Sequence, residues 1–488
     1  MKLKTLFSWK NLFFFVLTKS LLLLSACSYK GNFLVNNPIA ETSNFPILSY
    51  LKNSINHTNN PENAQNSTYS IPKYNQSNAY IFQFLKSRVI SLTTTYQNVI
   101  NIGTGTILAK VSSNQNDYHF YVATNLHFAK NFLNYNQVNF KAQFHYNPYL
   151  QLEQPTEDQL LDQEQISFDL ANNYLNFKNH YDANPIVWTA TNLEINDYQI
   201  LVSENNNNKW KIIKSNQQQK NSFFDQEGIE HRFAADLAIL KLDFANLFSL
   251  KQHQLNNNWS LYQTLFINNV LNKDVKFNYQ SNTDGYILGF PKNINQANNP
   301  KTKIGMVNLK LSQQNLNSNL EDGGNFYPPY VFQNDQNIAT INFQNHTYFT
   351  SLVSDYVINQ LNLQPGASGS IFVHYDNNHQ EVYLNGIYWG ITAEVNDDDN
   401  SKKQNKQPLL VDSHGWITKF TDPGHYDLIG SSQTNLSNTP ANNSFCNYLR
   451  DEISKQNQNR SVLESYSISS TSDYNKSQTK HLVLPSFC

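Results

Sequence analysis

Glycine is scarce in this chain, and half of its 16 glycines fall in four short stretches. Each stretch adjoins a run of β-forming residues, and the four read NIGTGTILA, GYILGFP, PGASGSIF and NGIYWGI. Glycine costs conformational entropy on folding, so it is placed where the backbone needs a positive φ or a close approach. This pattern predicts a β-rich fold whose strands meet special backbone requirements at four places.

Residues 80–430 contain further strand-like segments. The runs at 88–93, 105–111 and 118–123 are rich in β-branched and aromatic residues, and Asn and Asp separate the last two. Such a succession is typical of an all-β domain. Short helices are predicted at 125–135 and 256–272.

Two long polar segments interrupt this pattern, at 145–230 and 292–345. Short strand-like runs occur inside the first segment, at 185–188 and 198–202. We interpret both segments as insertions in a β-scaffold that carry some structure of their own.

Length and charge limit the class of protein. The chain has 488 residues and a formal net charge of -2, which is long enough for two or more cores. A near-neutral balance of charges argues against a nucleic-acid-binding protein.

The acidic run 397–399 is predicted to be a solvated loop and not a metal site, since calcium loops need spaced ligands. We expect no metal and no cofactor.

The N-terminus has the features of an export signal over residues 1–26. Lys2, Lys4 and Lys10 precede apolar runs at 12–17 and 21–24, which end in Leu-Ser-Ala-Cys. A transmembrane helix is the alternative, but Lys19 interrupts the apolar run and the run is short for a bilayer.

The sequence Leu-Ser-Ala-Cys resembles the lipobox of bacterial lipoproteins. The resemblance implies cleavage before Cys27, acylation of its thiol and a lipid anchor on the extracellular face of the cell membrane. The polar residues 27–79 are then predicted to form a tether.

Cys446 and Cys488 are the remaining cysteines. In an exported protein they could form a disulfide or stay as two free thiols, and the sequence leaves both open. Both lie in 431–488, which is rich in Ser and Asn and which we interpret as a partly ordered tail without a core pattern.

Three residues form a candidate catalytic set, in the chain order His127, Asp236, Ser368. A serine hydroxyl is a weak nucleophile and needs a base to accept its proton. An imidazole titrates near neutrality and can act as that base. A buried carboxylate orients the imidazole and stabilises the cation that forms.

The glycine-flanked serine also suggests an oxyanion hole. The backbone N–H groups of Gly366 and Ser368 are the predicted donors to the developing negative charge. Rival residues lack part of the pattern. His231 and Asp225 have no apolar strand directly after them as Asp236 has, and Ser370 has no glycine two positions earlier.

These motifs together resemble those of trypsin-like serine proteases. TGTILA, VATNLHF, DLAILKL, GYILGFP, PGASGS and NGIYWGI occur in the family's order between residues 100 and 395. The order His, Asp, Ser is that of trypsin and differs from those of subtilisin and the α/β-hydrolases. With the lipobox and the Asn-rich insertions, the set resembles the mycoplasma lipoprotein family of trypsin-like serine peptidases, which includes the mycoplasma immunoglobulin proteases.

The resemblance implies a fold and an activity. The fold would be a mainly β double barrel over 80–430, with the first barrel at about 80–245 and the second at about 280–425. The activity would be that of a surface serine endopeptidase acting on protein. Host immunoglobulin heavy chains would be the substrate, and an antibody-binding lipoprotein would be a partner.

The resemblance also assigns residues to the substrate cleft. Asn362 lies six positions before Ser368, where trypsin-like enzymes often have the base of the specificity pocket. It is not an acid, so a preference for Lys or Arg is not expected. Tyr388, Trp389 and Gly390 match the cleft strand, although Trp389 could equally be a core residue. Ala367 stands where trypsin has an aspartate, which argues against activation by a new N-terminal amine.

A second class of function is a catalytically inactive lipoprotein that keeps the fold and binds a host protein such as immunoglobulin. An intact His, Asp and Ser set favours the enzyme, because a binding protein has no need of all three residues.

Overall fold

The structure is a computed structural model of the 488-residue chain. It describes residues 28–29, 81, 84–85, 87–96, 99–113, 117–133, 139–146, 164–169, 185–191, 193–194, 199–204, 209–214, 222–224, 230–249, 270–271, 273–277, 285–290, 305–309, 331–332, 340–349, 355–359, 366–376, 379, 381–395, 410–422, 426–432, 443–466 and 482–488.

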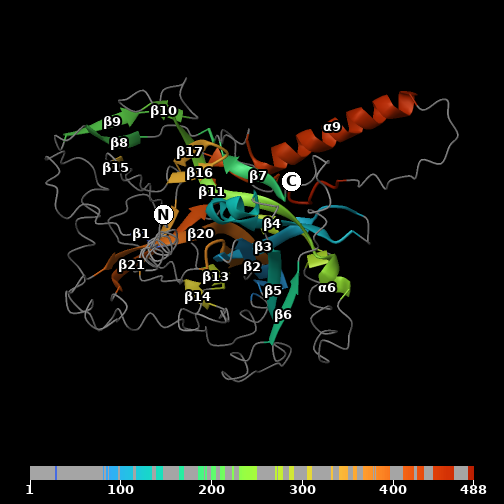
Figure 1. Ribbon diagram of the computed structural model, residues 1–488, viewed down its shortest axis with the longest axis horizontal. Helices are drawn as coiled ribbons and strands as arrows, with labels where there is room; N and C mark the ends of the chain where they lie inside the picture. Colours follow the sequence, from blue (N-terminus) through green and yellow to red (C-terminus); the bar gives the residue numbers. More distant parts are fainter. Residues whose placement is uncertain are drawn as a thin grey trace, which may run out of the picture.

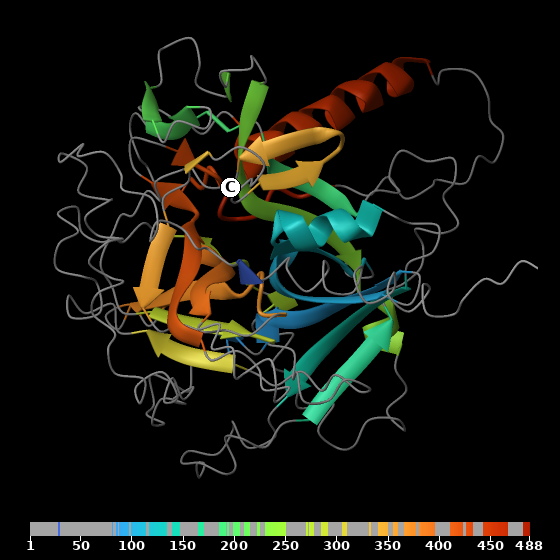
Figure 2. The ribbon, with the colours of Figure 1, turned by 60° about the vertical axis from the view of Figure 1, so that its left-hand side comes forward.

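Two antiparallel sheets lie side by side, the first in blue to green and the second in yellow to orange (Figure 2). The main strands of the first sheet are β2 (Val89–Tyr96), β3 (Val99–Lys110), β4 (His119–Thr124), β5 (Asn139–Tyr146), β7 (Ile186–Thr191) and β11 (Glu230–Asp243). Those of the second are β13 (Gly285–Gly289), β14 (Gly305–Leu309), β18 (Asp355–Asn359), β19 (Ile371–Asp376), β20 (Glu381–Val395) and β21 (Leu410–Lys419).

The two sheets share one strand order. The first runs β7-β11-β4-β3-β2-β5 and the second runs β14-β13-β19-β20-β21-β18. When the six main strands of each sheet are numbered along the chain, the first sheet has the order 5-6-3-2-1-4 and the second has the order 2-1-4-5-6-3. Both orders are stretches of the same closed ring, 1-2-3-6-5-4, in which strand 4 returns to strand 1. Among the described residues, the first sheet lacks only the pair 4-5 of this ring, and the second lacks only the pair 2-3. Strands one to four of the first sheet are a Greek key, with the fourth beside the first. The predicted mainly β fold of two trypsin-like barrels is confirmed.

Alternation along β4 and β11 explains how the core is divided. Phe120 and Val122 of β4 pack in one hydrophobic cluster inside the first barrel, whereas Tyr121 and Ala123 pack in another that extends to the second barrel. Successive strand residues point to opposite faces, so both faces of these strands are buried. This is why β11 reads as a nearly continuous apolar run after Asp236.

The segments 145–230 and 292–345 are not insertions throughout, because they also supply the main strands β7 and β14. Other strands in or next to these segments pair with each other and with β11. β8 (Gln199–Glu204) pairs with β9 (Lys209–Lys214) and with β15 (Val331–Phe332). β10 (Ser222–Phe224) pairs with the start of β11, and so does β17 (His346–Phe349), which forms a hairpin with β16 (Thr340–Phe343). β6 (Glu164–Asp169) extends the first sheet beyond β5.

The remaining named elements complete the described fold. They are β1 (Ser28–Tyr29), α4 (Leu126–Ala129), the 3-10 helix η2 (Lys130–Leu133), α6 (Ala245–Ser249), β12 (Lys276–Phe277), β22 (Thr421–Asp422), β23 (Tyr426–Asp427) and α9 (Phe445–Tyr466). α4 and η2 fall in the predicted helical segment 125–135, whereas most of the other, 256–272, lies outside the described residues.

The interpretation of the C-terminal cysteines as lying in a tail without a core pattern is wrong. α9 begins against β7 and then projects from the body of the molecule (Figure 1). Phe445, Cys446, Leu449 and Phe487 are almost fully buried in the same cluster as Leu428. Phe445, Cys446 and Leu449 have helical spacing at the start of α9, but the Ser- and Asn-rich composition of the segment masked this short pattern.

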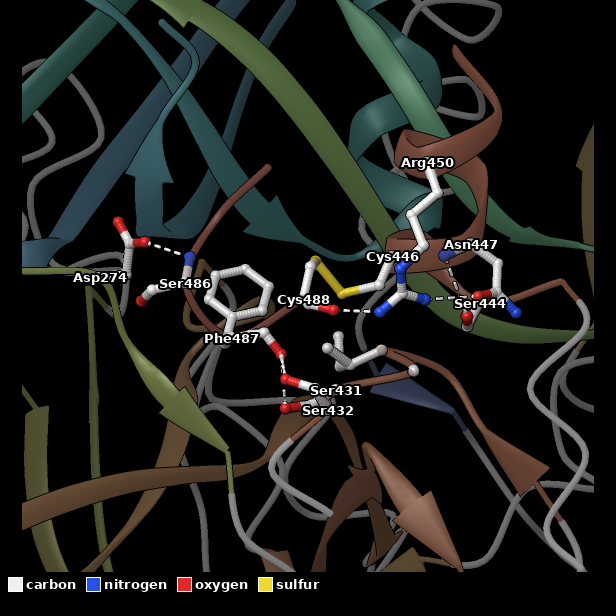
Figure 3. Close-up of a disulfide and its surroundings, with 12 residues drawn as sticks. Asp274, Ser431, Ser432, Ser444, Cys446, Asn447, Arg450, Ser486, Phe487 and Cys488 are labelled. Carbon is white, nitrogen blue, oxygen red and sulfur yellow. Dashed lines mark hydrogen bonds between the residues drawn. A yellow bond between two sulfur atoms is a disulfide. The ribbon is translucent and has the colours of Figure 1, made fainter. Parts of the chain in front are cut away.

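The open question of the two thiols is answered by a disulfide. Cys446 and Cys488 are bonded, with their Cα atoms 5.1 Å apart (Figure 3). The Ser431 hydroxyl donates to the carbonyl of Phe487 at 2.8 Å, and the Phe487 ring lies 4.9 Å from that of Phe277. The disulfide therefore ties residues 482–488 to α9, with the Phe487 ring packed beside Phe277 of β12.

The N-terminal predictions lie mostly outside the described residues. Cys27 and the signal segment are not among them, and Ser28 and Tyr29 of the predicted tether form β1 beside Ile391 and Thr392 of β20. Within the described part of the chain, no helix is long and apolar enough to cross a membrane.

Candidate active site

His127 and Asp236 meet where β4 leads into α4. β4 and β11 run antiparallel with Thr124 opposite Ala238, so the end of β4 lies beside Asp236. His127 Nδ1 is 2.6 Å from Asp236 Oδ2, and the backbone N–H of His127 donates to Oδ1 at 2.9 Å. Both carboxylate oxygens therefore hold the same histidine, one through its ring and one through its backbone.

This geometry decides which ring nitrogen can act as a base. A carboxylate accepts hydrogen bonds, so its contact with Nδ1 keeps a proton on that atom and leaves Nε2 with the lone pair. The side chain of Asp236 is 6% exposed and that of His127 is 18% exposed. The carboxylate is thus largely shielded, while the histidine ring reaches solvent.

Asn125 is a site residue that the sequence did not single out. It is the N-cap residue of α4 but makes no side-chain cap; its Nδ2 donates to the backbone carbonyl of Asp236 at 2.7 Å. The residue is fully buried, and its Oδ1 has no hydrogen-bond partner among the described residues. The signal in the sequence that could have identified Asn125 is its position two residues before His127.

Ser368 lies on a tight loop, 366–370, that leads into β19. The Ser370 N–H donates to the Ala367 carbonyl at 2.9 Å, and the Gly369 N–H donates to the Tyr388 carbonyl at 2.9 Å. The Ser368 hydroxyl lies 3.5 Å from the carbonyl oxygen of Trp389. The loop is therefore tied to β20, the strand predicted to line the cleft.

Gly369 shows why the loop needs glycine. Its φ is +95°, in the region that side chains rarely adopt. A Cβ at this position would overlap the carbonyl oxygen of Thr104 and would lie 2.9 Å from Thr124 Oγ1. The loop 366–370 of the second barrel thus packs directly on strands β3 and β4 of the first.

Thr104 joins that loop to the first barrel. Its N–H donates to the Ser368 carbonyl at 2.8 Å, and its hydroxyl donates to the Gly366 carbonyl at 3.0 Å. Thr124, three residues before His127, donates from its hydroxyl to the Thr104 carbonyl at 2.8 Å. Ser368 and the segment that carries His127 are therefore held at the same seam between the barrels.

The proposed oxyanion donors lie on this loop. The Ala367 carbonyl accepts from Ser370, and C=O and N–H point in opposite directions across a trans peptide. The Ser368 N–H is therefore directed away from Ser370. Gly366 has a φ of 99°, and its carbonyl accepts a hydrogen bond from the Thr104 hydroxyl.

The other sequence-predicted residues fall in several places. Tyr388 is buried, Trp389 is half-buried, and Gly390 pairs with Trp416 of β21. Asn362 and the rival Asp225 lie outside the described residues. The rival Ser370 is buried with its hydroxyl donating to the Ala367 carbonyl, and His231 lies on β11 opposite Phe223 of β10.

Metal binding has no candidate in the described ranges, where no group of three or more His, Cys, Asp or Glu side chains could hold an ion. On β4, burial raises the pKa of Tyr121 above its ordinary value, so this tyrosine is a neutral hydroxyl at physiological pH. The chemistry that this seam offers is acid–base catalysis and a hydroxyl nucleophile.

Two sheets of the same strand order, with a His–Asp pair and a glycine-flanked serine at their seam, define the fold of the trypsin-like serine-protease class.

Comparison with known proteins gives matches to solved structures alone. No protein-family model matches the chain, and no curated protein sequence matches it. The structure of the mycoplasma MIB and MIP proteins is similar at 13% identity and a TM-score of 0.43, over 72% of this chain and 58% of that one. The chain thus spans 58% of the length of that neighbour.

Two proteases also match. A thermostable serine protease of an extremophilic microorganism matches at 11% identity and a TM-score of 0.27, over 69% of this chain and 92% of its own. A Mycobacterium tuberculosis protease in its active form matches at 10% identity and a TM-score of 0.25, over 71% of this chain and 83% of its own. The strand order, and not these scores, carries the assignment of the fold.

Proposed function

We propose that the protein is a serine endopeptidase that hydrolyses peptide bonds through His127, Asp236 and Ser368. The observation that carries the proposal is the His127–Asp236 pair. Both carboxylate oxygens hold the histidine, and the ring contact places the free lone pair on Nε2. A pair of this kind, beside a serine loop at a barrel seam, suits a base that activates a hydroxyl.

The reaction would proceed in two halves. Ser368 Oγ attacks the substrate carbonyl while His127 Nε2 accepts its proton, and the Gly366 and Ser368 N–H groups stabilise the oxyanion. The intermediate collapses to an acyl-enzyme as His127 returns the proton to the leaving amine. Water then attacks the ester with His127 again as the base, which releases the acid and restores the serine. Asp236 keeps the ring in place throughout.

The substrate class and the setting of the enzyme are further parts of the proposal. The sequence resemblance to the mycoplasma immunoglobulin proteases favours host immunoglobulin heavy chains as substrate and an antibody-binding lipoprotein as partner. The lipobox favours a lipid anchor at Cys27 on the extracellular face of the cell membrane. Within the cleft, Asn362, Trp389 and Gly390 would contact the substrate.

The test is cleavage by full-length protein in detergent of antibody and of an unfolded general substrate such as casein. Cleavage of either that is lost in Ser368→Ala, and reduced about 10⁴-fold in Asp236→Asn, is the expected result. Cleavage of casein with intact heavy chains would support the peptidase and reject the antibody substrate. Failure to cleave either, with antibody still bound, would support the inactive binding protein instead.

A further inference from the structure

Thr104 has an unusual set of contacts for a residue in the middle of a strand. It is fully buried in β3, and its hydroxyl donates to the Gly366 carbonyl at 3.0 Å while accepting from the Phe290 N–H at 3.1 Å. A threonine hydroxyl has one proton to donate, and here that proton goes to loop 366–370, the nucleophile loop of the proposed reaction. The same hydroxyl accepts from the residue that follows β13.

The backbone of Thr104 adds two more contacts. Its N–H donates to the Ser368 carbonyl at 2.8 Å, and its carbonyl accepts from the Thr124 hydroxyl at 2.8 Å. One residue of the first barrel therefore holds the carbonyls on both sides of Ala367. The peptide between Ala367 and Ser368, which carries the Ser368 N–H, lies between these two anchors.

We propose that the Thr104 hydroxyl is a positioning group that holds the nucleophile loop in its reactive geometry across the seam between the barrels. This inference rests on the proposed function, because it assigns a role in the same reaction. Thr104 acts through Gly366 and Ser368. Loss of its hydroxyl frees the Gly366 carbonyl and leaves the buried Phe290 N–H without this acceptor, so the loop can leave the orientation that serves the oxyanion.

The chain offers a matched control two residues further along β3. Thr106 is also buried, at 1% exposed, but its hydroxyl has no hydrogen-bond partner among the described residues. Thr104→Val and Thr106→Val make the same change of a hydroxyl to a methyl group on the same strand. Thr104→Ser keeps the hydroxyl and removes the methyl group, so it should rescue the function that Thr104→Val loses.

The first measurement is the second-order rate constant for labelling of full-length protein by a fluorophosphonate, at a temperature where every variant is folded. We expect Thr104→Val to label at least about 10-fold more slowly than wild type. The labelling rates of Thr104→Ser and Thr106→Val should stay within about 3-fold of the wild-type rate.

The second measurement does not depend on activity. Hydrogen exchange, followed by mass spectrometry, reports on the amides of Gly369 and Ser370, which donate to Tyr388 and Ala367. In Thr104→Val these amides should exchange at least about 10-fold faster than in wild type, since local opening sets their rate. In Thr106→Val and Thr104→Ser they should not.

The outcomes separate the two claims. Faster exchange in Thr104→Val, with no labelling of any variant, would show that the hydroxyl holds the loop, but it would reject the peptidase and with it the role of Thr104 in the reaction. Labelling and exchange of Thr104→Val at wild-type rates would overturn the positioning role and leave the peptidase in place. A lower melting temperature of Thr104→Val with unchanged labelling and exchange would show that the hydroxyl contributes to stability alone, which also overturns it.

Discussion

Individual residues at the seam are placed by contacts that reach across the chain. His127 and Asp236 are 109 positions apart, and Thr104 and Gly366 are 262 apart. The sequence singles out His127, Asp236 and Ser368 as candidates through local motifs that match what the proposed chemistry needs, and the structure brings His127 and Asp236 into contact. Thr104 and Asn125 could not, because their importance depends on which carbonyl lies opposite each side chain after folding.

Gly369→Ala tests the backbone at this scale. Its φ of +95° and the closeness of a Cβ to Thr104 should lower the free energy of unfolding by about 2 kcal/mol or more and abolish labelling of Ser368. Thermal unfolding and fluorophosphonate labelling measure the two effects. Ser368→Ala is the control, since it should lose labelling and keep its melting temperature. A Gly369→Ala protein with wild-type stability and labelling would show that the loop is not constrained in this way.

At the scale of the elements, the positions of strands could be predicted better than the pairing between them. The runs at 88–93, 105–111 and 118–123 correspond to β2, β3 and β4. The pairing of β8 with β15 joins segments from both predicted insertions and has no local signal. Register between distant strands is set by the whole sheet, so a single sequence indicates a strand without naming its neighbour.

The disulfide gives a prediction for the C-terminal element. Cys446 and Cys488 are separated by 42 residues, and closing a loop of this length restricts the unfolded chain by about 4 kcal/mol in the chain-entropy model. Cys446→Ala/Cys488→Ala should therefore lose several kcal/mol of unfolding free energy, measured by denaturant titration. Reduction of the wild-type protein should give a similar loss. A double variant as stable as the oxidised protein would contradict this role of the disulfide.

The start of β20 carries an ionic cluster that should make a small contribution to stability. Lys276 and the Tyr383 hydroxyl donate to Glu381, and these bonds lower the pKa of its carboxyl group. A lowered carboxyl pKa stabilises the fold at neutral pH, and this contribution is lost as the pH falls through the folded pKa. The cluster is exposed, so Glu381→Gln should cost less than about 1 kcal/mol at pH 7.

The measurement for Glu381→Gln is the difference in unfolding free energy between variant and wild type as a function of pH. The difference should shrink on acidification as Glu381 becomes protonated. A difference that stays constant or grows toward low pH would show that the carboxylate is not stabilised by these bonds.

At the scale of the whole molecule, the hydrophobic core extends beyond residues 80–430, the segment that the sequence assigned to the barrels. The order of strands in both sheets agrees with the resemblance in the sequence, but the core also includes residues beyond 430. Ser- and Asn-rich composition hid these residues, since they form only one short helical pattern at 445–449 and a few positions at 487–488. Long-range burial of this kind is a property of the assembled fold.

Removal of residues 431–488 should therefore unfold the protein. The truncation takes Phe445, Leu449 and Phe487 from the core, and each large buried side chain contributes about 3–5 kcal/mol. The sum exceeds much of the stability of an ordinary domain. Circular dichroism and a thermal melt test this, with Phe487→Ala as a milder variant that should fold with a lowered melting temperature. A truncated protein that melts like the full chain would mean that the barrels are complete without this segment.

The proposed peptidase activity depends on Ser368 being an activated nucleophile. The most direct measurement is fluorophosphonate labelling of full-length protein in detergent, with the adduct located by mass spectrometry and with Ser368→Ala and His127→Ala as controls. We predict a single adduct on Ser368 that is absent from Ser368→Ala and strongly reduced in His127→Ala. A folded wild-type protein that takes no label, or takes it equally in Ser368→Ala, would contradict the peptidase assignment.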